Sequence, residues 1–489
     1  NPEMTVDEAL FYLTQNNEEK LVEATSCLQR TFFQGSGWKK KVWLQYVRSL
    51  KLQKNNLKQL FRVLRVIVYQ NNENKIEVDN KEGLNKITKA LKRNKDKETR
   101  QHLTGLLWSL SSHDKIKESF SKENIDVLTN VILVPSSGIY RGENPKDDLA
   151  ADPEAFYNAT GCLRNLSSAG PNIRDQMRDC RNLVDSIVCH IRLTAADRLS
   201  DDESTGNCIC ILQNLAYGLK PKPQLSSESD NESRESVKPE KTSTGCFSSL
   251  SPKEVIHLKN TKACQLALNA NPVGIEWLWS PIMIRTYLSL MACSERDSTR
   301  KGAMGALQNI TSGNCLESEA IADFIVHKED GLQKIKKVLE EKVCEEQAAQ
   351  LIRNLSRHSI VQDDIVKHVL SDVVQMLPND DRGKDQSREL TACLCQILIN
   401  LTKGGIKNAK AIIDLKALTK INYIARISDG RDPSQAGRAA CILMQLMWQH
   451  TALHSYIRKV SGLKKKHFIN KRTNAVMESE EQKRKLSNF

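Results

Sequence analysis

Aromatic side chains are scarce in this sequence and make up only 5% of its 489 residues. Strands favour aromatic and β-branched side chains, whereas stacked helices can be packed with small aliphatic ones. The scarcity therefore argues against an all-β core. The sequence also lacks any apolar run near the ~18 residues that a membrane-spanning helix needs, and it shows no signal-peptide pattern. Because the chain starts at Asn1 and not at Met, we expect a fragment of a longer protein.

The sequence motifs of common enzymes and metal sites are missing as well. There is no Walker-type phosphate loop, no His-Glu-x-x-His zinc motif and no nucleophile elbow. The ten histidines are dispersed, and the i, i+4 pair His450 and His454 has no Cys or carboxylate beside it. The fourteen cysteines are scattered, which is typical of small buried side chains in a reducing compartment. We therefore predict a non-enzymatic protein with no cofactor and no metal site.

What the sequence does contain is one short helical motif that recurs along the chain. Its clearest copy is Gly161-Cys-Leu-Arg-Asn-Leu-Ser167, and we call the position of the asparagine n. The seven copies place position n at Ser109, Asn165, Asn214, Asn309, Asn354, Asn400 and Gln445. Successive copies are 56, 49, 95, 45, 46 and 45 residues apart. A period near 45 residues is typical of helical solenoid repeats, with insertions in the two long gaps.

The motif has an apolar and a polar face when it is wound as a helix at 100° per residue. Positions n−2 and n+1, Leu163 and Leu166 in the clearest copy, share the apolar face, and n−4, n−1 and n lie opposite. We expect the apolar face to build the core and the polar face to line a groove across the stacked repeats. The candidate groove residues, which we call the stripe, are Arg164, Asn165, Gln213, Asn214, Gln308, Asn309, Arg353, Asn354 and Asn400. The alternative is that each Asn only hydrogen-bonds the backbone of the neighbouring repeat.

These side-chain types suit an extended, acidic protein segment as the partner. Asn and Gln amides can both donate to and accept from the backbone of an extended peptide. Arginine adds a two-pronged contact to a carboxylate or a phosphate. The net charge of +13 agrees with an acidic partner, but it equally favours phospholipid surfaces or nucleic acid.

The chain is predicted to have four segments. Residues 1–217 hold the first repeats, 218–272 a disordered insertion in the fifth repeat, 273–460 the remaining repeats, and 461–489 a basic tail. The insertion is rich in Ser, Lys, Glu and Pro and shows no sustained apolar period, so it cannot bury enough apolar surface to fold. The tail carries basic clusters at 464–466 and 483–485. Such clusters can be nuclear signals or lipid contacts, but more often they are solvated, and we interpret these as solvated.

Three local features refine this division. Thr5 is predicted to cap the first helix, with Glu8 completing a capping box. The early repeats are the least regular, because Val66 occupies position n and a further motif helix is expected only loosely near residue 30. Residues 134–153 hold three prolines and two glycines and are predicted to form a long loop.

The copies at 161–167 and 305–311 resemble armadillo repeats. Longer strings are similar to the delta-catenin and plakophilin family, although residues 20–70 depart from its pattern. The strings that carry this resemblance are 101–114, 142–149, 158–169, 243–247, 274–280 and 376–381. The resemblance implies an all-α, right-handed superhelical solenoid of about nine armadillo repeats, with a disordered insertion in the fifth.

The same resemblance implies a scaffold of desmosomal cell–cell junctions at the cytoplasmic face of the plasma membrane, which is also found in cytoplasm and nucleus. The implied partners are desmosomal cadherin tails, plakoglobin and desmoplakin. Part of that binding belongs, in such proteins, to an N-terminal head that we expect to lie outside this sequence.

Two alternative functions use similar repeats. A nuclear import carrier would pair a groove Trp at n−4 with Asn at n, but the n−4 residues here are Gly, Cys or Gln, and Trp108 stands at n−1. A nucleic-acid-binding repeat protein would want stacking aromatics along its groove, and few are present.

Overall fold

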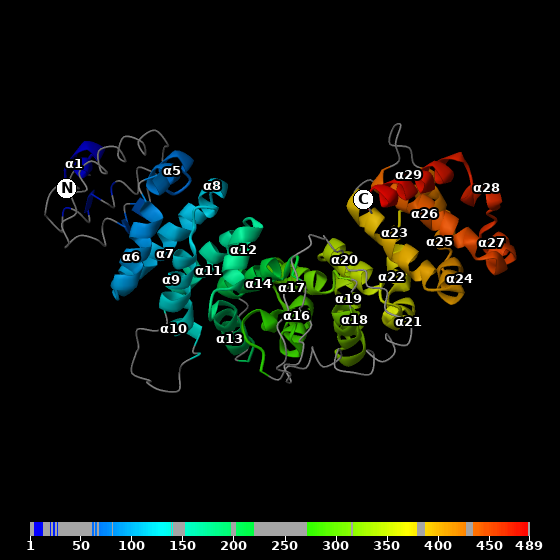
Figure 1. Cartoon of the computed structure of the whole chain (residues 1–489), viewed down its shortest axis with the longest axis horizontal. Helices are drawn as coiled ribbons and strands as arrows, with labels where there is room; N and C mark the ends of the chain where they lie inside the picture. The colour runs from blue at the N-terminus through cyan, green and yellow to red at the C-terminus, as the bar shows by residue number, and fades with distance from the viewer. Residues whose placement is uncertain are drawn as a thin grey trace, which may run out of the picture. The chain divides into compact units, whose positions relative to one another are not determined.

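The computed structural model describes most of the chain outside its early repeats and its predicted insertion. The described residues are 4–12, 20, 23–24, 27, 61–62, 64–65, 68–80, 82–137, 139, 152–196, 202–219, 271–313, 316–378, 387–426 and 434–487. Every regular element within them is a helix, as Figure 1 shows. The predicted all-α class is therefore confirmed.

The chain forms two compact units. Unit 1 comprises Asn1–Leu215 and Pro272–Trp277, and unit 2 comprises Ala216–Asn271 and Leu278–Phe489. The helices up to the first long gap are α1 Val6–Tyr12, α5 Asn72–Asn80, α6 Gly83–Arg93, α7 Lys97–Ser111, α8 Asp114–Lys117, α9 Lys122–Leu128, η2 Thr129–Leu133, α10 Val134–Ser137, α11 Pro153–Ser167, α12 Pro171–Arg178, α13 Leu183–Ala196 and α14 Glu203–Ala216.

After that gap the chain resumes with a short 3₁₀ turn and then continues as helices. These elements are η4 Gly274–Trp279, α16 Pro281–Cys293, α17 Asp297–Ile310, α18 Leu316–Asp323, η5 Phe324–Lys328, α19 Gly331–Glu340, α20 Glu345–Leu355, α21 Ser359–His368, α22 Leu370–Gln375, α23 Arg388–Lys403, α24 Ile406–Asp414, α25 Ala417–Arg426, α26 Gln435–Gln449, η6 Thr451–Leu453, α27 His454–Ser461, α28 Lys465–Phe468 and α29 Lys471–Ser487.

The seven predicted motif copies all lie on helices, namely α7, α11, α14, α17, α20, α23 and α26. Leu163 and Leu166 on α11 are fully buried, as the helical period predicted. The same two positions are buried in the other copies, except that Leu446 on α26 is half-exposed. The apolar face of the motif therefore forms the core that holds neighbouring motif helices together.

Local capping signals set where these helices begin. The Thr5 hydroxyl accepts from the Glu8 amide at 3.3 Å, and the Glu8 carboxylate accepts from the Thr5 amide at 2.8 Å, which confirms the predicted capping box. On α11, the Asp152 carboxylate accepts from the Glu154 amide at 3.1 Å. Pro153 follows as the first helical residue, where its missing N–H costs no hydrogen bond.

Among the predictions about irregular segments, one was wrong and one was incomplete where the structure describes them. Val134–Ser137 continues as the last turn of a helix and Pro153 begins the next one, so the predicted loop over 134–153 is shorter at both ends. The basic segment after Ser461 folds as α28 and α29, because Phe468 and Val476 between its charged residues are buried. The many charged residues of this segment make its apolar positions hard to recognise in the sequence.

Other predictions fall on residues that are not described. The predicted insertion lies outside them except at its ends, as do Val66 and the motif helix expected near residue 30. The count of nine repeats and the four predicted segment boundaries therefore stay predictions.

Candidate partner-binding surface

In unit 1 the amides at position n join adjacent motif helices. Asn165 Nδ2 donates to Ser111 Oγ at 3.1 Å, and Asn214 Nδ2 donates to Ser167 Oγ at 2.9 Å. Both serines are fully buried, and each stands at n+2 of the preceding motif helix. The same bond therefore recurs from one repeat to the next, with the spacing that the motif sets.

In unit 2 the amides make equivalent bonds. Asn400 Nδ2 donates to Ser356 Oγ at 2.9 Å and to the Arg353 carbonyl at 3.3 Å. Asn354 Nδ2 donates to the carbonyl of Gln308 at 2.8 Å. Asn309 is half-buried on α17. The side-chain amides of Asn354 and Asn400 thus hold adjacent repeats together, which is the structural role that the sequence left open as an alternative. A binding role for the groove residues stays a prediction.

The side chains at n−1 are more open than the amides beside them. Arg164 is exposed, and its Nη1 donates to Asn207 Oδ1 on the next motif helix at 3.2 Å. Arg353 on α20 is exposed as well. Gln213 and Gln308 are half-buried, and Gln308 Nε2 donates to the carbonyl of Gln347. The two arginines are therefore the stripe residues best placed to meet a partner.

Arg357 lies close to Arg353 and was not among the predicted residues. Its Nη2 donates to the Thr311 carbonyl at 3.1 Å and to Asn354 Oδ1 at 3.0 Å. Burial, followed by the charge of Arg353, lowers the pKa of Arg357. Two guanidinium groups near each other favour an anion between or above them. Its spacing of four residues from Arg353 was the sequence signal for this pairing.

The glycines at n−4 do not belong to an open polar face. A Cβ atom on Gly161 would lie 2.5 Å from a ring atom of Trp108, and one on Gly105 would lie 2.5 Å from the guanidinium of Arg65. Trp108 and Arg65 both stand at n−1 of the preceding motif helix. The prediction that n−4 shares the stripe was wrong at these copies, because the neighbouring repeat covers that position.

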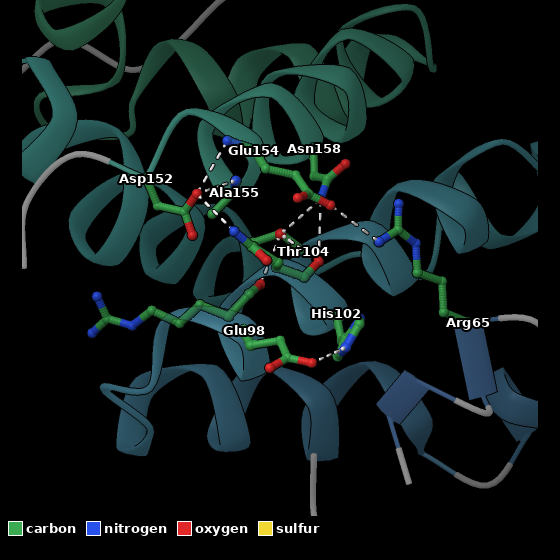
Figure 2. Close-up of polar contacts among 10 residues, drawn as sticks. Arg65, Glu98, His102, Thr104, Asp152, Glu154, Ala155 and Asn158 are labelled. Atoms are coloured by element: carbon green, nitrogen blue, oxygen red, sulfur yellow. Dashed lines mark hydrogen bonds and ion pairs between the residues drawn. The ribbon is translucent and has the colours of Figure 1, made fainter. Parts of the chain in front are cut away.

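A second set of polar contacts lies between α7 and the start of α11, shown in Figure 2. Asn158 Nδ2 donates to the Gln101 carbonyl at 3.1 Å, and Gln101 Nε2 donates to Asp152 Oδ1 at 3.1 Å. Arg65 Nη1 lies 3.6 Å from Glu154 Oε1. Beside them, burial lowers the pKa of His102 although Glu98 lies 3.6 Å away.

Asn158 stands at n−7, and Asn207 stands at the same position of the next motif helix. Asn207 Nδ2 donates to Thr160 Oγ1 at 3.4 Å, and Asn158 Nδ2 reaches the equivalent Thr104 Oγ1 at 3.4 Å. These two amides were not among the predicted residues. Position n−7 holds no Asn in the other copies, where it is His102, Gly302, Gln347, Cys393 and Arg438, so the repeat pattern gave no signal for these contacts.

Unit 2 contains a hollow of about 870 Å³ beside the stripe. Gln347, whose carbonyl accepts from Gln308, lies at its wall. The charged lining residues are Lys301, Lys342, Glu340, Glu345, Glu346 and Asp372. Because carboxylates outnumber lysines there, an acidic partner would be repelled from the hollow and attracted to the arginine side of the stripe.

The described residues also bear on membrane spans, metal ions and reactive thiols. None of their helices is long and apolar enough to cross a membrane, and no group of three or more His, Cys, Asp or Glu side chains among them could hold a metal ion. Eight of the described cysteines are buried, as the sequence analysis expected, whereas Cys293 is exposed. Burial raises the pKa of the Cys395 thiol to about 12, which keeps it an unreactive thiol.

Comparison with known proteins gives close sequence relatives, although no family model matches the chain. Plakophilin-2 of Danio rerio is 46% identical over 390 residues, which cover 78% of this chain and 47% of the relative. Plakophilin-2 of Homo sapiens is 33% identical over 527 residues, covering 96% and 59%. Plakophilin-3 of Bos taurus is 31% identical over 417 residues, covering 83% and 52%. The chain thus spans about half the length of the curated relatives it matches, and the resemblance seen in the repeats is confirmed.

Solved structures agree on the fold. An engineered protein matches with a TM-score of 0.62 at 16% identity, covering 97% of this chain and 98% of that one. A structure that concerns the interaction between cadherin and beta-catenin matches with a TM-score of 0.56 at 13% identity, covering 92% and 78%. At such identities the matches speak for the fold alone, and they agree with the predicted armadillo-repeat fold class.

Proposed function

The chain belongs to the plakophilin family of armadillo-repeat proteins, and from this premise we propose that it is a non-enzymatic adaptor of desmosomal cell–cell junctions that binds cadherin tails. The observation that carries the proposal is the pair of exposed arginines, Arg164 and Arg353, each beside an amide that is held by the neighbouring repeat. An exposed guanidinium group on a rigid helix surface suits the recognition of a flexible acidic segment.

The amides contribute by fixing the support on which the arginines stand. Asn354 donates to the preceding motif helix and accepts from Arg357, so its side chain has one orientation. Arg353 then projects from a surface that does not need to be ordered when a partner binds. Preorganisation of this kind lowers the entropy cost of binding.

The cations determine the charge of the partner. Arg353 and Arg357 in unit 2, and Arg164 in unit 1, offer guanidinium groups that suit carboxylates or phosphates. The hollow of unit 2 is acidic and would turn the partner towards Arg353 and Arg357 of the same unit. We therefore propose an extended, acidic segment of the cadherin tail as the ligand of the predicted groove residues.

One solved neighbour supports this choice of partner by analogy. The structure with a TM-score of 0.56 concerns the interaction between cadherin and beta-catenin, a different protein with the same class of fold. The import-carrier alternative has no support at n−4, because the space in front of Gly161 is filled by Trp108 and could not admit a groove tryptophan.

The finer parts of the proposal concern further partners and location. We extend it to plakoglobin and desmoplakin as additional partners, and to cytoplasm and nucleus as additional locations. They rest on the family resemblance and not on a particular contact of this chain. Co-precipitation from epithelial lysates with antibodies to each partner tests them one by one, and absence of a partner removes it from the proposal.

Charge reversal at the two exposed arginines tests the central part. Isothermal titration of a purified desmosomal cadherin tail should give binding to the unchanged protein and none to Arg164→Glu/Arg353→Glu. The matched control is Arg93→Glu/Arg181→Glu, which changes the net charge equally at two exposed positions outside the stripe.

Both double variants should retain the helical circular dichroism and melting temperature of the unchanged protein, since all four side chains are exposed. Binding by the stripe variant equal to that of the control would contradict the proposal. Unfolding of the stripe variant alone would show that the arginines are structural.

A further inference from the structure

Positive charge is concentrated in one part of the sequence that the proposed partner does not use. Residues 403–471 contain fourteen lysines and arginines, three aspartates and no glutamate, a formal charge of +11 against +13 for the whole chain. Of the three aspartates, the structure describes only Asp414. The rest of the chain is therefore nearly neutral, and the excess charge belongs to the last described helices of unit 2.

Helix α24 carries this charge on one arc. Ile406, Lys407 and Lys410 lie on its exposed side, with Lys403 exposed just before it. The opposite side, with Ala409, Ile412 and Ile413 among its residues, is buried. Lys407 Nζ lies 2.9 Å from Asp363 of α21, but both side chains are mostly exposed, so water screens the pair.

Helix α27 continues the same surface. Lys410 Nζ lies 5.3 Å from the centre of the Tyr456 ring, and the Tyr456 hydroxyl donates to Asp414. The only described acidic side chain of the segment is thus already engaged. Arg458 and Lys459 are exposed on α27. Figure 1 shows α24, α27 and α28 at the C-terminal end of unit 2. Helix α28 and its N-cap residue add three further exposed lysines, Lys464, Lys465 and Lys466.

Aliphatic side chains stand exposed among these cations. Ile406 is 46% exposed, Leu415 beside Lys416 is 39% exposed, and Ile469 after the three lysines is 38% exposed. Apolar side chains ringed by lysines match an anionic lipid surface, where the acyl boundary takes the aliphatic groups and the headgroups take the charges.

We infer that this basic edge, formed by α24, α27 and α28, docks on membranes that contain anionic phospholipids. Four to eight clustered basic residues are enough for such binding, because each contributes through the negative surface potential. None of the predicted groove residues belongs to the basic edge, so the membrane and a protein segment use different side chains of the molecule.

Nucleic acid is the other polyanion that the charge would attract, but the edge is poorly built for it. Binding of single strands relies on aromatic rings on which bases stack. The Trp448 ring stacks on His454, with 3.8 Å between the ring centres, and on Phe468, with 4.9 Å between the ring centres. Phe468 is fully buried. These rings serve the interior of the molecule, whereas the exposed apolar groups of the edge are aliphatic.

Co-sedimentation with vesicles tests the inference. The unchanged protein should sediment with vesicles of phosphatidylcholine and phosphatidylserine and stay in solution with phosphatidylcholine alone. Lys407→Glu/Lys410→Glu/Lys459→Glu should weaken binding by about 100-fold, since each basic residue near an anionic surface strengthens it about fivefold. Lys89→Glu/Lys92→Glu/Lys95→Glu, three exposed lysines of unit 1, is the control with the same net charge and should bind nearly as well as the unchanged protein.

A second variant distinguishes insertion of an apolar side chain into the membrane from attraction of the lysines to the lipid headgroups. Ile406→Ser keeps every cation and should reduce sedimentation several-fold, with an unchanged melting temperature. The Arg164→Glu/Arg353→Glu variant should still sediment, so that failure here is distinguishable from failure of the proposed adaptor role.

Several results would overturn the inference. These are no sedimentation of the unchanged protein with anionic vesicles, equal loss in the two triple variants, or retention of binding by the Lys407→Glu/Lys410→Glu/Lys459→Glu protein. Binding of an oligonucleotide that the basic edge variant abolishes, without vesicle binding, would assign the edge to nucleic acid instead.

Discussion

Some residues that were predicted to bind a partner hold neighbouring repeats together, and Asn214 is an example. Asn214 was predicted from its place in the motif, and its side chain donates to the buried Ser167 hydroxyl at 2.9 Å. The sequence placed the amide on the correct helix and face. It could not show which repeat the amide would contact, because that depends on how one motif helix lies against the next.

Removal of this amide should therefore lower stability. Asn214→Ala leaves a buried hydroxyl without one of its partners, which costs about 1–3 kcal/mol. Urea unfolding followed by circular dichroism measures the change. Asn85→Ala, at an exposed position of α6, is the control and should alter the unfolding free energy by less than about 0.5 kcal/mol. Equal small effects in both would mean that the repeats do not depend on the amide.

His327 links two neighbouring helices through both of its ring nitrogens. Nδ1 lies 2.7 Å from Asp323 Oδ1, and Nε2 lies 2.9 Å from Asp364 Oδ2 on α21. An imidazole can donate from both nitrogens only when it is protonated. The hydrogen bonds to Asp323 and then to Asp364 raise the pKa of His327 above its usual value.

A raised pKa in the folded state makes this contribution to stability depend on pH. It is fully present below the unfolded-state pKa of about 6.5 and is lost as the pH rises through the higher folded-state pKa. His327→Gln should therefore cost more unfolding free energy at about pH 5 than at about pH 9, as urea unfolding at both values would measure.

His358 provides the opposite case and serves as the comparison. Burial, followed by the charge of Arg357, lowers the pKa of His358 to about 4. The unfolded state then binds the proton more readily, so stability falls as the pH drops from about 6.5 towards 4. His358→Gln should remove that loss. Identical pH profiles for the two variants would contradict both assignments.

At the scale of helices, the apolar period was the reliable signal and the glycines were the misleading one. Leu163 and Leu166 are buried as predicted, because a single helix determines its own apolar face. Gly161 was assigned to the open face on the same reasoning, yet it faces Trp108 of α7. Position within one helix cannot reveal what an adjacent helix places in front of it.

The contact between Gly161 and Trp108 predicts a specific coupling. Gly161→Ala would place a Cβ atom 2.5 Å from the Trp108 ring and should destabilise the protein by about 1–3 kcal/mol, as overpacking does. In a Trp108→Ala background the same change should be neutral or stabilising, since Ala favours the helix by about 1 kcal/mol over Gly. A double-mutant cycle by urea unfolding measures the coupling, and additive effects would show that the two residues do not touch.

The C-terminal helices show a second limit of prediction at this scale. The basic residues of the segment after Ser461 suggested a solvated tail, but Gln445 Nε2 donates to Thr473 Oγ1 at 3.1 Å and Phe468 is fully buried. In that segment only a few apolar side chains meet the last motif helix. Their pattern is too sparse for a periodicity argument, so the helix is seen only when its contacts are known.

At the scale of the whole molecule, the repeat period and the family strings were enough to predict the all-α armadillo class. The distribution of charge carries information that the net charge of +13 does not, because residues 403–471 alone carry +11. Recognising that concentration separates a basic edge from the stripe of Arg164 and Arg353. One net charge therefore corresponds to two surfaces with different proposed ligands.

In the proposed binding surface, the amides hold adjacent repeats together while the arginines beside them bind an acidic segment. The most direct measurement is the affinity for a desmosomal cadherin tail at a series of salt concentrations, for the unchanged protein and for Arg164→Gln/Arg353→Gln. Salt should weaken the unchanged complex strongly, and the variant should bind more weakly with a flatter salt dependence. Equal affinity and an equal salt dependence in the two proteins would contradict the claim.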